Sequence, residues 1–320
     1  MMRATTLSAL ILMAFPRFFS PSACAEDFYT GRTMPYAAFD RLTATPVTVA
    51  GGTLNIGFAP GSFTLPHERI LAWLTKSAEA VATYYGRFPV PEARILIVPT
   101  AGAGVRGGQA FGYRGPAIRL MVGRDSTEAD LKDDWKAVHE MVHLALPDVP
   151  EDNLWLAEGL AVYVESIARV QAGDLTAEKI WSDFVGQMPR GLPESGDSGL
   201  DETHTWGRIY WGGAIFYLLA DIEYRKRSGN KTGLQQAMRG VVAAGGTHDQ
   251  DWPVRKILAT ADTAAGFPVM TELYEKMRAT PMDPDLALLW RQLGINAAGS
   301  HVTFDDSAPL AAIRRAITAR

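Results

Sequence analysis

The stretch from residue 126 to 172 constrains the fold most, because it is typical of two helices separated by prolines. Apolar residues recur at helical spacing in its first part, at Leu131, Trp135, Val138 and Val142. Pro147 and Pro150 interrupt this pattern, and a second helical segment follows from about Asn153 to Ala172. The prolines let the second helix fold back against the first, so side chains on the facing surfaces should meet.

Two histidines on the first helix predict a metal site. His139 and His143 are four residues apart, so their rings lie on the same helical face and can ligate one zinc ion. A catalytic zinc ion takes a third protein ligand, which Glu158 on the second helix can supply. Glu140 could activate a zinc-bound water and deliver its proton to a leaving amine. The alternative is a pair of surface histidines beside a solvated glutamate.

The second helix carries the motif WLAEGLAVYVE at residues 155–165. Together with the H-E-x-x-H motif at 139–143, it resembles the gluzincin metallopeptidases and is similar to the aminopeptidase N and glycyl aminopeptidase families. The resemblance implies one zinc ion per chain, held by His139, His143 and Glu158, with Glu140 as the catalytic base. Ala157 replaces the asparagine usual in those families, and the loop between the motifs is shorter.

Glu165 follows Glu158 by seven residues and should lie on the same helical face. It could hydrogen-bond a ligand histidine and so fix the orientation of that ring. A solvated charge on the helix surface is an equally good interpretation of Glu165.

The segment that begins IYWGGAIFYLL at residue 209 is similar to a helix of those families that opens Y-x-K-G-A. The resemblance implies that the Tyr210 hydroxyl donates to the oxyanion of the tetrahedral intermediate, although Gly212 replaces the lysine. A core aromatic at a helix start is the alternative for Tyr210. His204 lies in an expected long loop over residues 184–206 and could reach the substrate as a second donor, or could be an ordinary surface residue.

Short strands are predicted at residues 93–99 and 117–123, after a hairpin at 45–57 and a helix at 66–85. In the similar aminopeptidases, an edge strand before the zinc helix carries a glutamate that binds the substrate amine. The matching stretch here, RGGQAFGYRG, provides no carboxylate, although Gly107 and Gly108 would let a substrate backbone approach. This favours an endopeptidase. The alternative is an aminopeptidase whose amine-binding acid lies elsewhere.

The resemblance implies an α+β fold, namely a thermolysin-like two-lobed metallopeptidase catalytic domain. We expect a small mixed sheet with the zinc-binding helices over residues 26–200 and a helical lobe over residues 201–320. The short stretch before His139 leaves no room for the large β-domain of aminopeptidase N relatives, so we expect a minimal catalytic unit.

Residues 1–25 are typical of a signal peptide, with an apolar run at 7–15 and a small-x-small site before Glu26. The protein should therefore be exported, to the periplasm or outside the cell. Lipidation at Cys24 is a less favoured alternative, because Pro21 stands where a lipobox prefers leucine. Cys24 is the only cysteine, so the mature chain should hold metal through His, Asp or Glu.

The charge distribution argues against nucleic acid as a partner. The chain carries 31 Lys and Arg against 35 Asp and Glu, and its longest basic run is RKR at 225–227. No later segment is long and apolar enough to span a membrane. We therefore expect a peptide or protein substrate. A non-catalytic zinc-holding or peptide-binding module of the same fold, and a zinc hydrolase acting on another substrate, remain open alternatives.

Overall fold

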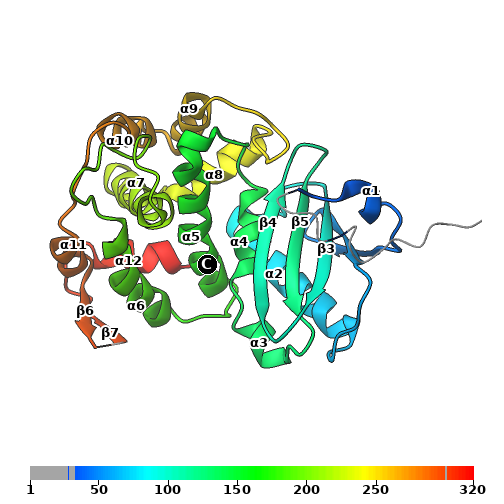
Figure 1. Cartoon of the computed structure of the whole chain (residues 1–320). Coiled ribbons are helices and arrows are strands. Elements are labelled where there is room, and N and C mark those ends of the chain that lie inside the picture. Colours follow the sequence, from blue (N-terminus) through cyan, green and yellow to red (C-terminus); the bar gives the residue numbers. More distant parts are fainter. Residues whose placement is uncertain (1–27, 29–32, 300) are drawn as a thin grey trace, which may run out of the picture.

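The computed structural model describes residue 28, residues 33–299 and residues 301–320. The predicted signal peptide, with Cys24, lies outside these residues. The described chain forms a mixed α/β part, on the right of Figure 1, and a helical part on the left. Within the described residues, no helix is long and apolar enough to cross a membrane.

The α/β part is built on a sheet with the strand order β1-β2-β3-β5-β4. Its strands are β1 (Thr45–Val49), β2 (Gly52–Phe58), β3 (Glu92–Thr100), β4 (Val105–Phe111) and β5 (Ala117–Gly123). β2, β3 and β5 are parallel, whereas β1 and β4 run antiparallel to their neighbours. The predicted hairpin and both predicted strands are confirmed, and among the described strands β4 is an edge strand with one side unpaired.

Both faces of the sheet are covered, because the side chains of β3 alternate between two apolar clusters. Ile95 and Ile97 belong to the main core beneath helix α2 (His67–Tyr85). Leu96 and Val98 pack in a smaller cluster with Phe39 of helix α1 (Tyr36–Phe39). A strand buried on both faces gives the uninterrupted apolar run seen in the sequence.

The first helical segment is divided, which corrects the expectation of one continuous helix. The structure has α3 (Glu128–Lys132) and α4 (Lys136–His143). Asp134 accepts a hydrogen bond from the backbone N–H of Ala137 at 3.0 Å and so starts a new helix. Trp135 lies in the break and is 44% exposed, so its predicted place on the apolar face is wrong.

The second helical segment is confirmed as α5 (Leu154–Gln171), which follows a 3-10 turn, η2 (Glu151–Asn153). α5 packs against α4 on one side and against α7 (Gly213–Ser228) on the other. It therefore joins the sheet-bearing part to the helical part, and Figure 1 shows it between them.

The rest of the described chain is mainly helical. Its elements are α6 (Ala177–Gln187), η3 (Met188–Gly191), η4 (Arg208–Gly212), α7, α8 (Leu234–Ala243), α9 (Val254–Ala265), α10 (Val269–Met277), α11 (Leu286–Leu293), the hairpin β6 (Ile295–Ala298) and β7 (His301–Phe304), and α12 (Ala311–Thr318). The loop expected over residues 184–206 is shorter, because residues 184–191 belong to α6 and η3.

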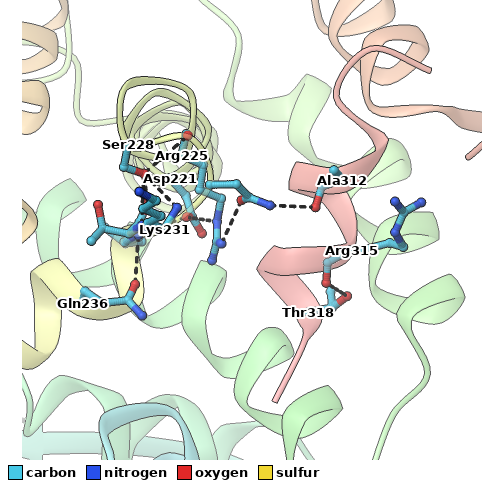
Figure 2. A network of polar contacts seen from close by, with 12 residues as sticks. Asp221, Arg225, Ser228, Lys231, Gln236, Ala312, Arg315 and Thr318 are labelled. Carbon is cyan, nitrogen blue, oxygen red and sulfur yellow. Dashed lines mark hydrogen bonds and ion pairs between the residues drawn. The ribbon is translucent and has the colours of Figure 1, made fainter. Parts of the chain in front are cut away.

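A polar network around Asp221 fixes α5, α7 and α12 relative to one another. The Tyr163 hydroxyl, from the motif on α5, donates to Asp221 at 3.1 Å. Arg225 donates to the same carboxylate at 2.8 Å and also to Asn230, whose amide donates to the carbonyl of Ala312. Figure 2 shows the contacts of Asp221 and Arg225 near the end of α7 and the hydrogen bond to Ala312, without Tyr163. The motif tyrosine therefore has a structural role here.

Candidate metal centre

The three predicted ligands meet where α4 faces α5. Nε2 of His139 lies 3.1 Å from Oε2 of Glu158, and Nε2 of His143 lies 3.6 Å from the same oxygen. All three ligand atoms lie within 4.8 Å of one another. Burial alone would raise the pKa of Glu158, but the two imidazoles outweigh this effect and hold its pKa below the usual range.

This donor set fits zinc. Two imidazole nitrogens and one carboxylate oxygen are common ligands of catalytic zinc, which leaves a fourth position open. Ligand atoms about 2.0–2.1 Å from a tetrahedral ion are roughly 3.3 Å apart, and the two distances to Glu158 are close to that spacing. The side chains therefore need little movement to surround an ion.

Glu140 lies beside the metal group under the edge strand. Glu140 is 8% exposed, and a Cβ added to Gly108 would lie 2.6 Å from Cγ of Glu140. Burial raises the pKa of Glu140, although the imidazoles of His143 and His139 oppose that shift. Gly108 is thus needed to make room for Glu140, which is a different reason from the substrate approach that the sequence suggested.

Tyr210 also lies next to the candidate ligands, within the π-helical turn η4 at the start of α7. Its ring stacks on His139 with centroids 6.4 Å apart, and its hydroxyl interacts with Glu158. Burial and then the carboxylates of Glu158 and Glu140 raise the pKa of Tyr210 above its usual value. At neutral pH the side chain therefore keeps its O–H and can donate it.

Glu165 has other partners than the expected histidine. Its carboxylate pairs with Arg169 at 3.0 Å and accepts a hydrogen bond from Ser166 at 2.9 Å. Nδ1 of His139 is buried and has no hydrogen-bond partner within the described protein. The arginine one helical turn further along α5 attracts the carboxylate, and among the described residues Glu165 makes no hydrogen bond to either ligand histidine, contrary to the expected orienting role.

His204 does not reach the metal group. Its Nε2 lies 3.0 Å from the carbonyl oxygen of Asp201, the side chain is exposed, and the residue does not line the cleft. The local turn of the loop holds this ring at the surface. The expected role of His204 in substrate binding is therefore not supported by its position.

His248 is a cleft residue that the sequence did not single out. It lies in the loop between α8 and α9, and its ring centroid is 6.4 Å from that of His143. Burial, and then the neighbouring His143, lower the pKa of His248 to about 4, so the imidazole is uncharged at neutral pH. A lone histidine in a polar loop carries no motif, so only the fold could reveal it.

A cleft passes over the three candidate ligands, Glu140, Tyr210 and His248. It runs between the edge strand β4 and the helices α4 and α5. Its lining includes Gly107, Gly108, Gln109, Ala110, Trp135, Lys136, His139, Glu140, His143, Leu146, Pro147, Asp148, Val149, Leu154, Ala157, Glu158, Tyr210 and His248. A substrate in this cleft would contact the metal group, Glu140 and Tyr210 together.

Comparison with solved structures supports the predicted fold. An aminopeptidase N family protein from Idiomarina loihiensis matches 80% of this chain and 49% of its own, with a TM-score of 0.56 and 16% identity. A mutant two-domain M1 zinc metallopeptidase bound to L-arginine matches 76% and 53%, with a TM-score of 0.50 and 15% identity. No protein-family model and no curated protein sequence matches the chain.

The likeness to these structures shows the fold alone, because the identities are low. The described chain has a gluzincin-like metallopeptidase fold, with a mixed sheet, the helices α4 and α5 that carry the candidate ligands, and a helical lobe, as the resemblance implied. The chain spans about half the length of the two proteins, at 49% and 53%.

Proposed function

We propose that this protein is a zinc-dependent metallopeptidase that hydrolyses peptide bonds. The observation that carries the proposal is the convergence of His139, His143 and Glu158, with ligand atoms within 4.8 Å, in a cleft also lined by Glu140 and Tyr210. A site that only held metal for structural reasons would need neither a buried carboxylate nor a phenol in the open cleft.

The residues around the site can divide the chemistry among them. Bound zinc would supply a positive charge that polarises a carbonyl group and acidifies water. Glu140 accepts the proton of the attacking water and passes it to the departing nitrogen. Tyr210 donates its O–H to the carbonyl oxygen as negative charge develops there. The unpaired edge of β4 can hold an extended peptide by backbone hydrogen bonds.

Export is the second part of the proposal. It rests on the signal-like segment at residues 1–25, which precedes the described fold. Expression of the full chain followed by cell fractionation and amino-terminal sequencing tests it. Mature protein beginning at Glu26 outside the cytoplasm is the expected result, whereas an intact amino terminus in the cytoplasm would contradict it.

The peptidase proposal is tested with the purified full chain, by measuring bound metal and profiling cleavage of a mixed peptide library by mass spectrometry. We expect one zinc ion per chain, and loss of cleavage with retained zinc in Glu140→Gln. Glu151→Gln is the matched control, because Glu151 is an exposed acid outside the cleft lining. Bound zinc without cleavage of any peptide would instead indicate a non-catalytic module.

A further inference from the structure

The turn that carries Tyr210 has an unusual form. η4 is a π-helical turn that begins at Arg208 and ends at Gly212, and α7 follows it directly. Such turns hold one extra residue and are rare outside functional sites. Successive residues of an α-helix lie about 100° apart around its axis. An α-helical turn in place of η4 would therefore rotate Tyr210 by up to roughly that angle relative to α7, so the direction of its hydroxyl depends on what keeps the turn open.

A buried ion pair anchors the start of η4. Nε of Arg208 lies 2.7 Å from Oδ2 of Asp197, and Nη2 of Arg208 lies 3.4 Å from Oδ1 of the same carboxylate. The two side chains are only 4% and 2% exposed. The guanidinium also donates through Nη1 to the carbonyl oxygen of Gly191 in η3. Because the guanidinium is planar, these contacts fix the orientation of the Arg208 side chain.

The backbone of η3 also lies directly against both sides of this turn. A Cβ on Gly191 would lie 2.2 Å from the backbone nitrogen of Gly212, at the end of η4. A Cβ on Gly207, just before η4, would lie 2.2 Å from the carbonyl oxygen of Arg190. η3 therefore supports η4 at its two ends, and the hydrogen bond from Arg208 to Gly191 fastens the two turns together.

We propose that Asp197 and Arg208 are positioning residues for Tyr210. The buried pair holds η4 in its π-helical form, and this form keeps the tyrosine ring over His139 and its hydroxyl at Glu158. Neither member of the pair lines the cleft that the described residues form, so its effect on catalysis passes through the turn. Loss of the carboxylate leaves an uncompensated buried charge on the arginine, which loosens the start of η4.

The inference rests on the proposed peptidase function, and a double-mutant cycle on the purified, zinc-loaded full chain tests it. Asp197→Asn should lower kcat about ten- to hundredfold, as a small misplacement of a catalytic group does. KM should change little, because the tyrosine acts only as charge develops on the carbonyl oxygen. In the Tyr210→Phe background the same change should lower kcat less than about twofold, since the hydroxyl that it misplaces is already gone.

Asp262→Asn is the matched control for lost stability. Asp262 is a buried acid of α9 outside the cleft lining, and it accepts hydrogen bonds from the backbone N–H groups of Met270 and Thr271 at 2.8 and 2.9 Å. Its substitution should lower the free energy of unfolding and leave kcat unchanged. Where Asp197→Asn does not fold, Arg208→Lys takes its place in the cycle, because lysine keeps the charge and loses the planar fork.

The outcomes separate the inference from the peptidase function. Equal falls in kcat in both backgrounds, or an unchanged kcat in Asp197→Asn, would overturn the inference and leave the peptidase function intact. If the wild-type protein cleaves no peptide, the peptidase function fails, and crystal structures of the wild-type protein and Asp197→Asn then test the pair. A Tyr210 hydroxyl displaced from Glu158 in the variant supports the inference, whereas an unmoved tyrosine overturns it.

Discussion

Gly159 of α5 and Gly213 of α7 bring their backbones into direct contact, and a Cβ on Gly159 would lie 2.4 Å from the Cα of Gly213. The residue before Gly159 is the candidate metal ligand Glu158, and Tyr210 lies three residues before Gly213. The close approach of the two helices therefore places the tyrosine beside the ligand. Both glycines belong to the sequence motifs, and this contact gives them a physical role.

Gly159→Ala should separate the two helices and move Tyr210 away from Glu158. We expect a loss of about 1–3 kcal/mol in the free energy of unfolding, which is typical of an overpacked core, and a fall in kcat. Urea denaturation and steady-state kinetics measure both. Gly186→Ala is the matched control, because Gly186 lies on α6 with open space around its Cβ position. The prediction would be contradicted if the two variants had the same free energy of unfolding and the same kcat.

Gly108→Ala should displace Glu140, whose Cγ would lie 2.6 Å from the new methyl group. We expect the cleavage rate to fall at least about tenfold, which corresponds to a loss of roughly 1.4 kcal/mol of transition-state stabilisation. The zinc content should not change, because the substitution does not touch the metal ligands. Gly186→Ala again serves as the control, since Gly186 lies outside the cleft lining and has open space around its Cβ position. Loss of zinc from the Gly108 variant, or full activity in it, would contradict the prediction that Gly108 makes room for Glu140.

The local features of the fold could be predicted from the sequence, whereas the contacts between distant segments could not. The hairpin, the helix at 66–85 and the ligand helices follow from periodicity and from prolines and glycines within a few residues. The break before α4 depends on Asp134 capping a new helix, which competes with an unbroken apolar pattern. His248 and Asp148 come together only because the loop after α8 folds across the end of α4.

Two of the predicted site residues show the same limit. Glu165 shares a helical face with Glu158, as its spacing predicted, but spacing could not show that Arg169 would take its carboxylate. His204 is close to Tyr210 in sequence, yet a loop turn directs its ring to Asp201. The spacing of a residue from a motif predicts the helix or loop on which it lies. The packing of neighbouring side chains decides what that residue contacts.

Glu165→Gln should affect the stability of the fold more than metal binding. The Glu165–Arg169 pair is buried, with both side chains 8% exposed, so the change leaves a buried arginine without its counter-charge. Breaking such a pair typically costs about 3–5 kcal/mol. The double variant with Arg169→Met should be more stable than Glu165→Gln alone. Chemical denaturation and metal analysis test this, and a specific loss of zinc would restore the metal-orienting role.

Removal of zinc should destabilise the protein without unfolding it. The apolar core extends well beyond the metal group, through the sheet and through the helical part. An ion present at about a thousand times its dissociation constant adds about 4 kcal/mol to the stability of the folded state. We therefore expect a chelator to lower Tm by several degrees and to abolish cleavage, and added zinc to restore both. His143→Ala should show the low Tm with or without the chelator.

Tyr210→Phe should lower kcat with little change in zinc content or in Tm. The phenol retains its proton at neutral pH because burial and nearby carboxylates raise its pKa, so the variant loses a neutral donor and no charge. Loss of one such donor typically costs about a hundred- to a thousandfold in kcat. Tyr113→Phe is the control, because Tyr113 is 62% exposed and its hydroxyl donates to Met34 outside the cleft lining. Unchanged kcat in Tyr210→Phe would show that the tyrosine only packs against His139.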